Sequence, residues 1–97
     1  MAAYIVATVR ISDAERFAAY GKTIAGLSEK HGGEPIVRGA VAEVFEGKSP
    51  VGERIVVTRF PSAEAARAYV QSAEYLAACQ HRIGAAEVEM RLLVDPA

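Results

Sequence analysis

Apolar residues recur with two periods along the chain, and together they predict four strands and two helical regions. Residues 3–9 and 55–60 carry apolar side chains on both parities, which is typical of central strands covered on both faces. Residues 88–94 alternate apolar with charged side chains, as a half-buried strand does. Residues 35–38 indicate a strand, and Pro35 places it at a sheet edge or at the beginning of the strand. A bulge is expected at Gly39-Ala40, with an extended continuation over 41–46.

The first helical region is expected between residues 12 and 32. Ser12 and Glu15 form a capping box, S-x-x-E, which predicts a helix N-terminus. Gly32-Gly33 predicts the end of the helix, because glycine accepts the left-handed conformation that a helix stop requires. Between them runs one apolar stripe at spacings of three and four residues, formed by Phe17, Tyr20, Ile24, Leu27 and His31.

The second helical region follows a corner at Pro61, which ends the preceding strand because proline has no N–H to donate. Ser62 is expected to be the N-cap of the helix that follows, and Glu64 suits the dipole of its first turn. Ser72 is a second capping position, and Gly84 is expected to end the helical piece that it begins. The stripe of that piece is formed by Leu76, Cys79, Ile83 and Ala86.

The order of elements is strand, helix, strand, strand, helix, strand, which predicts an α+β, ferredoxin-like βαββαβ fold. Right-handed crossovers place the first and third strands side by side in the middle of a four-stranded antiparallel sheet. Two helices cover one face of such a sheet. Because both central strands are apolar on both faces, a second copy of the chain is the expected cover of the other face, and we predict a homodimer.

Composition narrows the functional classes. At 97 residues the chain is expected to form one domain over residues 1–97, and its net charge of −1 without a basic cluster argues against nucleic-acid binding. No apolar stretch approaches the roughly 20 residues that span a bilayer, and no leader pattern precedes the first strand, so we expect a cytoplasmic protein that is not bound to membranes. The single Cys79 excludes an intrachain disulfide.

Three arginines and two possible proton-transfer groups are the candidate site residues. Arg38 and Arg59 interrupt apolar strands, where a guanidinium group needs a partner or a water-filled pocket, and Arg82 lies in the last helical piece. We predict that the three arginines bind an anionic ligand in a cavity between sheet and helices. His81 and Glu43 are the candidate catalytic groups. The alternative is that these side chains lie in solvent or in ion pairs, with Glu43 as a partner of Arg38.

Cofactor and metal motifs are missing from the sequence. The glycines form no phosphate-binding loop, no serine stands in a nucleophile elbow, and His31 and His81 lack the spacing of a metal site. We therefore expect no cofactor and no metal.

Several short segments resemble the family of domain of unknown function 1330, and together they cover nearly the whole chain. They are Tyr4-Ile5-Val6-Ala7, His31-Gly32-Gly33, Val37-Arg38-Gly39, Val44-Phe45-Glu46-Gly47, Arg59-Phe60-Pro61-Ser62 with Ala65-Ala66, and Ser72-Ala73-Glu74-Tyr75 with Arg82. The resemblance implies a dimeric α+β barrel, in which two ferredoxin-like subunits pack sheet to sheet and each holds a ligand-sized cavity. The chain departs from the family pattern at Ala40, Ala73 and Glu34-Pro35.

Two functional hypotheses follow. By analogy with the superfamily, the protein is a cofactor-independent enzyme, of the oxygenase, isomerase or dehydratase type, acting on a small organic molecule. Against the oxygenase version, the chain contains no Trp and no Asn, which serve in haem-degrading relatives. The alternative is a non-catalytic or stress-related module that binds a small carbonyl or carboxylate compound. A histidine or carboxylate with a shifted pKa in the cavity would favour the enzyme, whereas a lining of arginine and apolar groups would favour binding.

Overall fold

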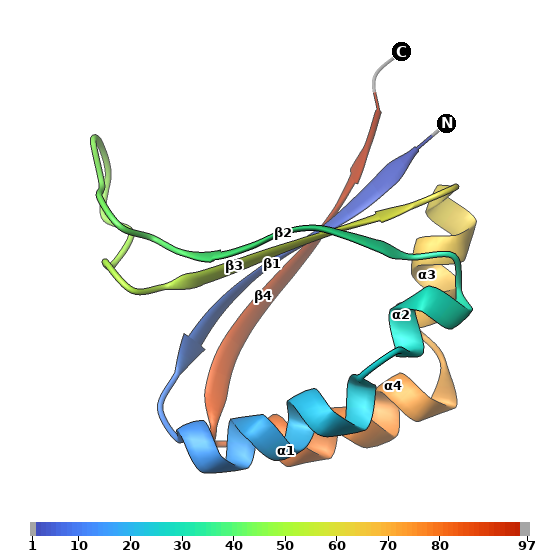
Figure 1. Ribbon diagram of the computed structural model, residues 1–97, viewed down its shortest axis with the longest axis horizontal. Helices are drawn as coiled ribbons and strands as arrows, with labels where there is room; N and C mark the ends of the chain where they lie inside the picture. Colours follow the sequence, from blue (N-terminus) through green and yellow to red (C-terminus); the bar gives the residue numbers. More distant parts are fainter. Residues whose placement is uncertain (1, 96–97) are drawn as a thin grey trace.

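A four-stranded antiparallel sheet carries helices on one face, and the chain follows the predicted βαββαβ order (Figure 1). The computed structural model describes residues 2–95. Its elements are β1 (Ala3–Ile11), α1 (Ala14–Ile24), α2 (Leu27–Lys30), β2 (Glu34–Ala40), β3 (Arg54–Phe60), α3 (Ala63–Val70), α4 (Ala73–Ala78), the 3₁₀ helix η1 (Cys79–Arg82) and β4 (Ala86–Val94). The predicted α+β, ferredoxin-like fold is confirmed.

The strand order is β2-β3-β1-β4, so the two strands predicted to be central are central. Their register decides which side chains share a face. Ala7 lies opposite Val56, and both face the helices, whereas Val6 lies opposite Val57 on the other face of the sheet. Successive residues of β1 and β3 therefore place apolar side chains on both faces of the sheet.

Strand β2 differs from the prediction in two respects. It ends at Ala40 instead of continuing to residue 46, and its irregularity lies between Pro35 and Val37 instead of at Gly39-Ala40. Proline has no N–H for the ladder, so the register slips next to Pro35. In the register that pairs Ala40 with Arg54, residues beyond 41 face a turn that contains Pro50, and regular pairing stops there.

The first helical region is two helices instead of one. Gly26 has a φ of 76°, a left-handed conformation that ends the run of helical backbone between α1 and α2. The N-cap of α1 is Asp13 and not Ser12: Asp13 Oδ1 accepts from the Arg16 N–H at 3.1 Å. The Ser12 hydroxyl instead donates to the Gly84 carbonyl at 3.4 Å, because the chain here is tied to the segment that precedes β4.

Both caps predicted in the second helical region are confirmed. The Ser62 hydroxyl oxygen accepts from the Ala65 N–H at 3.1 Å and begins α3. The Ser72 hydroxyl oxygen accepts from the Tyr75 N–H at 3.2 Å and begins α4. Gly84, with a φ of 76°, follows η1 and turns the chain into β4.

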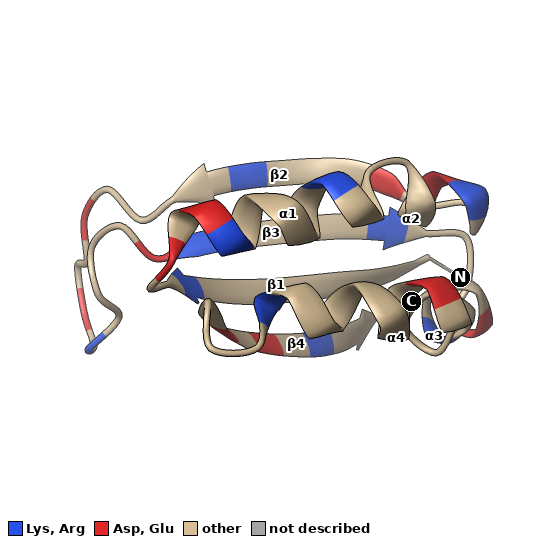
Figure 2. Ribbon diagram, turned by 90° about the horizontal axis from the view of Figure 1, so that it is seen from below, with Lys and Arg blue, Asp and Glu red and all other residues tan. Residues whose placement is uncertain are grey.

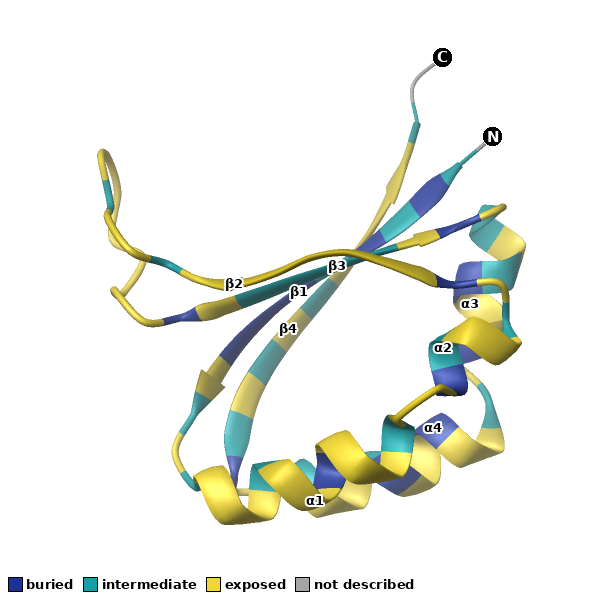
Figure 3. Ribbon diagram, in the orientation of Figure 1, coloured by how far each residue is buried: buried dark blue, intermediate teal, exposed yellow. Residues whose placement is uncertain are grey.

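The core lies at one end of the sheet, where α2, α3 and α4 approach it (Figure 3). Phe60, which is 0% exposed, stacks on Tyr69 with ring centroids 5.6 Å apart, and Tyr69 contacts Tyr75 at 5.0 Å. Leu27 and Ile5 complete this cluster from α2 and β1. The helical layer is thus attached to the sheet mainly through aromatic side chains at this end.

A second attachment holds the N-terminus of α1. The Ala85 carbonyl accepts from the Ser12 N–H at 2.8 Å and from the Asp13 N–H at 3.0 Å. The Arg16 Nη2 group donates to the Ile83 carbonyl at 2.6 Å. Helix α1 is therefore held at both ends, by the aromatic core near α2 and by the segment that precedes β4. No helix of residues 2–95 has the length and apolarity needed to cross a membrane.

We expect Gly33→Ala to destabilise the protein by about 1–3 kcal/mol, the usual cost of an overpacked core. A Cβ at Gly33 would lie 2.8 Å from the Ser28 carbonyl oxygen and 2.9 Å from the Phe60 ring. Urea unfolding measures the change. Gly39→Ala is the matched control, because a Cβ there meets no atom within 4 Å. Equal stability of the two variants would contradict close packing at Gly33.

We expect Ser62→Ala to lower the free energy of unfolding by about 1 kcal/mol, because the Ala65 N–H loses its cap. Thermal and urea unfolding measure the loss. Ser49→Ala, at an exposed position between β2 and β3, should leave stability unchanged within about 0.5 kcal/mol. If the two variants melt together, the cap contributes nothing.

Candidate functional site

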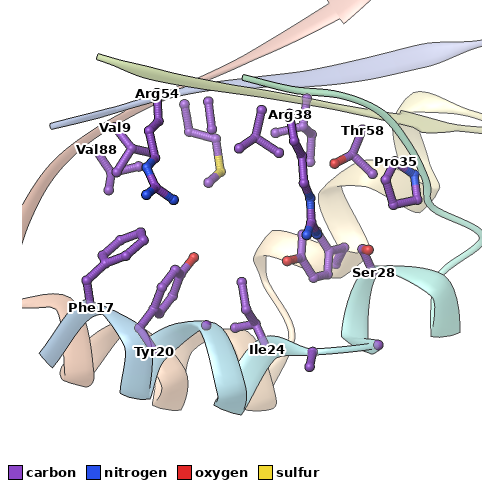
Figure 4. Close-up of a pocket in the computed structure, with 18 of the residues that line it drawn as sticks. Val9, Phe17, Tyr20, Ile24, Ser28, Pro35, Arg38, Arg54, Thr58 and Val88 are labelled. Carbon is purple, nitrogen blue, oxygen red and sulfur yellow. The ribbon is translucent and has the colours of Figure 1, made fainter. Parts of the chain in front are cut away.

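A cavity of about 940 Å³ lies between the sheet and α1, on the face that carries the helices (Figure 4). Its sheet-side wall includes the apolar residues Ala7, Val9 and Val56 from the two central strands. Phe17 and Ile24 of α1 form the opposite wall. The volume is that of a site for a small organic molecule, which commonly measures a few hundred to 1,000 Å³.

The cavity exists because small side chains meet where α1 faces the sheet. Ala7 on β1 and Ala18, Gly21 and Ala25 on the helical side all line it, and none is large enough to fill the space. Natural cores avoid voids of this size, since unfilled volume loses dispersion contacts. Helix α1 is held at both ends, so it cannot collapse onto the sheet between them.

Two arginines enter this cavity from adjacent strands. Arg38 of β2 lies opposite Val56, and Arg54 of β3 lies opposite Ala40, so the two are diagonal neighbours on one face of the sheet. Both point from the sheet towards the helices in Figure 4. Diagonal neighbours have Cα atoms roughly 7–8 Å apart, so two positive charges lie within reach of one ligand.

These two cations have no protein counter-charge among the described residues. The ion pairs within residues 2–95 involve Arg10, which contacts Glu53 at 2.7 Å and Glu87 at 3.2 Å. The carboxylate that lines the cavity is that of Glu29, and it accepts a hydrogen bond from the Ser28 hydroxyl at 2.7 Å. Arg38 and Arg54 therefore retain donors that a ligand can use.

A tyrosine cluster lies behind the helical wall. The Arg82 Nη1 group donates to the hydroxyls of Tyr20 and Tyr75, each at 3.0 Å, and Tyr20 lines the cavity. Burial raises the pKa of the Tyr75 hydroxyl far above its usual range; the adjacent Tyr20 adds to this, and Arg82 opposes it. The pKa of Tyr69, another lining residue, is also raised by burial. Tyr69 and Tyr75 are therefore neutral phenols near neutral pH.

The face of the sheet away from the helices has a hollow of about 900 Å³, and its arginines are already satisfied. Arg10 contacts Glu53 and Glu87, and the Arg91 guanidinium donates to the Thr8 hydroxyl. The charge pattern therefore distinguishes the two hollows, and uncompensated arginines meet apolar walls in the cavity beside α1.

The structure separates most of the residues predicted for the site. Arg38 lines the cavity, and Arg82 lies one layer behind it, bonded to the hydroxyl of a lining tyrosine. Arg59 follows Thr58 on β3, so it projects from the opposite face of the sheet and does not line the cavity. Glu43 is exposed in the segment between β2 and β3, and His81 is exposed in η1.

The predicted geometry around Glu43 was wrong in one respect. Because β2 ends at Ala40, Glu43 is not on the same strand as Arg38, and the two form no ion pair in the described structure. The exposed positions of Glu43 and His81 are equally well explained by solvated surface side chains without a catalytic role. Their catalytic roles, and ligand binding by Arg59 and Arg82, stay predictions.

Sequence reasoning missed Arg54 and the role of Tyr20. Arg54 stands one residue before the apolar strand expected at residues 55–60, and it was not among the predicted site residues. A signal was present, because Arg54 has the same parity as Phe60, the residue that packs under the helices. Tyr20 was assigned to the apolar stripe, which is correct for its ring. Its hydroxyl gained a role only through Arg82, which is 62 residues away in the chain.

Residues 2–95 contain no group of three or more His, Cys, Asp or Glu side chains that could hold a metal ion. The donors that line the cavity are guanidinium and hydroxyl groups, which suit anions and carbonyl oxygens. These donors can recognise oxygen atoms on an organic molecule.

Solved structures with the same fold come from several bacteria. A protein of unknown function from Rhodopseudomonas palustris has a TM-score of 0.78 and 22% identity, covering 98% of this chain and 84% of that one. A dimeric ferredoxin-like protein of unknown function from Jannaschia sp. has a TM-score of 0.75 and 15% identity, covering 98% and 100%. SnoaB, a cofactor-independent oxygenase from Streptomyces nogalater, has a TM-score of 0.67 and 11% identity, covering 99% and 94%.

At these identities the likeness shows the fold alone. No curated protein matches the sequence. The family model described as domain of unknown function (DUF1330) matches residues 2–95, which include every strand and helix of the fold and the whole cavity. The chain therefore belongs to the DUF1330 family.

Proposed function

We propose that the protein binds a small organic anion with an apolar body in the cavity between the sheet and α1. The observation that carries this proposal is the pair Arg38 and Arg54, which enter one apolar cavity without a carboxylate partner in the described chain. Two like charges on one sheet face repel each other. An anion between them removes that repulsion and accepts hydrogen bonds from both guanidinium groups.

The apolar walls define the rest of the ligand. Val9, Val56 and Phe17 provide aliphatic and aromatic surface, and burial of a ligand's apolar area against them contributes roughly 25 cal/mol per Å². An inorganic anion would use none of this surface. A carboxylate or enolate attached to a ring system uses both the arginines and the walls.

Binding is favoured over catalysis by the lining of the cavity. His31 and His81 do not line it, and Glu29 is the carboxylate that does. Apart from Glu29, the side chains that line it are guanidinium groups, hydroxyls, a thioether and apolar groups. A cofactor-independent enzyme remains the second hypothesis, since the Tyr20 hydroxyl is a weak acid at the cavity wall.

The binding proposal predicts that Arg38→Gln and Arg54→Gln each weaken binding of 2-naphthoate about 10- to 100-fold. The physical reason is the loss of a charge-assisted hydrogen bond, which contributes about 1.5–3 kcal/mol. Isothermal titration calorimetry with purified protein measures the dissociation constants. The neutral isostere 2-naphthamide should bind weakly to the parent and be little affected by either substitution.

Two further arginines make the test specific. Arg67→Gln, on the exposed side of α3, is the matched control and should bind 2-naphthoate like the parent. Arg59→Gln separates the two faces of the sheet, since Arg59 lies on β3 as Arg54 does but projects the other way. A loss confined to Arg59→Gln would contradict binding in this cavity.

We also propose that the chain forms a homodimer through the sheet face opposite the helices. Apolar side chains stand on this face in the described chain, and several are well exposed. Val37 is 49% exposed and Leu93 is 54% exposed, and Val6, Ile55 and Val57 lie between them, half-buried. A contiguous apolar patch on a sheet is a typical protein interface, and sheets pack face to face about 10 Å apart. The structural neighbour from Jannaschia is described as dimeric.

The dimer proposal predicts a mass of twice 10.3 kDa by sedimentation equilibrium at micromolar concentration. Val57→Asp should yield a monomer, because a carboxylate at the centre of the interface would be buried without a partner. Leu76→Asp is the control, since Leu76 is 55% exposed on α4 and lies on the other side of the molecule. A monomeric parent, or a dimeric Val57→Asp variant, would contradict this interface.

A further inference from the structure

The Tyr20 hydroxyl lies at the wall of the cavity that faces the two arginines. Its ring belongs to α1, whereas Arg38 and Arg54 descend from the sheet, and Figure 4 shows the hydroxyl pointing up into the space between them. The ring packs on Phe17 with centroids 5.3 Å apart, which fixes its orientation. A ligand held by the arginines therefore lies against the wall that carries this hydroxyl.

Within the cluster of Tyr20, Tyr75 and Arg82, the hydroxyl proton of Tyr20 takes part in only a long hydrogen bond. A phenol has one O–H donor and can also accept. Arg82 has only donors, so Tyr20 accepts from it at 3.0 Å and keeps its own proton for another partner. The Tyr20 hydroxyl donates this proton to the Tyr75 hydroxyl at 3.3 Å, which is longer than the usual 2.5–3.0 Å for an O–H···O bond.

Tyr75 does not return a strong hydrogen bond to Tyr20. Its hydroxyl donates to Met90 Sδ at 3.6 Å and accepts from Arg82 at 3.0 Å. The Arg82 guanidinium lies 5.1 Å from the centre of the Tyr20 ring and 5.7 Å from that of Tyr75. This cation holds both rings and polarises their O–H groups, which strengthens each as a donor.

We propose that Tyr20 is a second recognition point of the cavity, donating its hydroxyl proton to a carbonyl oxygen at the end of the ligand remote from its anionic group. Arg82 is the positioning residue, because it occupies a lone pair of the Tyr20 oxygen and directs the proton towards the cavity. The inference deepens the proposed function and rests on it. The ligand class is an apolar ring system with a carboxylate or enolate at one end and a ketone or quinone-type oxygen at the other.

The test uses two probes that differ in the acceptor alone. 6-Acetyl-2-naphthoate carries the carbonyl oxygen, and 6-isopropyl-2-naphthoate replaces it with a methyl group of similar size. The measured quantity is the ratio of their dissociation constants, isopropyl over acetyl, obtained by calorimetry. We expect Tyr20→Phe to lower this ratio about fivefold relative to the parent, the effect of losing one hydrogen bond between neutral groups.

Matched variants distinguish a specific contact from a general disturbance. Tyr4→Phe removes a tyrosine hydroxyl from the opposite face of the sheet and should leave the ratio unchanged. Arg82→Met should lower the ratio as Tyr20→Phe does while binding of 2-naphthoate persists, and Arg82→Lys should restore part of it. Arg38→Gln should weaken both probes equally, because both carry the carboxylate.

Each result of this experiment either supports or overturns the proposed role of Tyr20. A lowered ratio in Tyr20→Phe with an unchanged ratio in Tyr4→Phe supports the second recognition point. An unchanged ratio in Tyr20→Phe, with both probes still dependent on Arg38, overturns the role of Tyr20 and leaves anion binding intact. If the parent binds neither probe, or if binding ignores Arg38, anion binding fails and the role of Tyr20 fails with it.

Discussion

Burial of Phe60 at the end of β3 is the contact on which the rest of the architecture depends. The ring is enclosed by Tyr69 on one side and by the backbone at Gly33 on another, where no larger residue fits. It therefore attaches the helical layer to one end of the sheet (Figure 1). Its parity also decides the facing of every other side chain of β3, because alternate residues of a strand share a face.

The cavity persists because α1 is held away from the sheet by contacts at its two ends and by α4 and η1, which pack beside it. The aromatic core holds one end, and hydrogen bonds to the Ala85 carbonyl hold the other. Between these ends, the small residues Ala18 and Gly21 of α1 and Ala7 of β1 leave a space that the larger lining side chains do not fill. Figure 2 shows β2 and β3 side by side, with arginine positions drawn in blue on both strands. Arg38 of β2 and Arg54 of β3 line the cavity, whereas Arg59 of β3 projects from the opposite face of the sheet.

The cavity beside α1 is a candidate site because two arginines without an ion-pair partner in the described chain line it. A guanidinium group in an apolar setting is stable when it is solvated, paired or bound to a ligand. Arg10 pairs with Glu53, whereas Arg38 and Arg54 are solvent-exposed at the cavity and have no carboxylate partner in residues 2–95. On the helical side, Arg82 donates to the Tyr20 and Tyr75 hydroxyls, which holds it in the wall behind the cavity. The lining combines guanidinium groups from the sheet, a tyrosine of α1 and apolar surface.

The amino-acid sequence alone determined the α+β fold, the central position of β1 and β3 and the caps at Ser62 and Ser72, because these follow from local periodicity and short-range hydrogen bonding. It also indicated Arg38 as a candidate site residue, because a single charged residue within an apolar strand can be recognised from the sequence alone. Tertiary structure decided which arginines meet. The register of β2 and β3 places Arg38 and Arg54 as diagonal neighbours on one face of the sheet. The alternation of side chains along β3 places Arg59 on the opposite face. These pairings depend on residues far apart in the chain, and no local pattern encodes the distance between them.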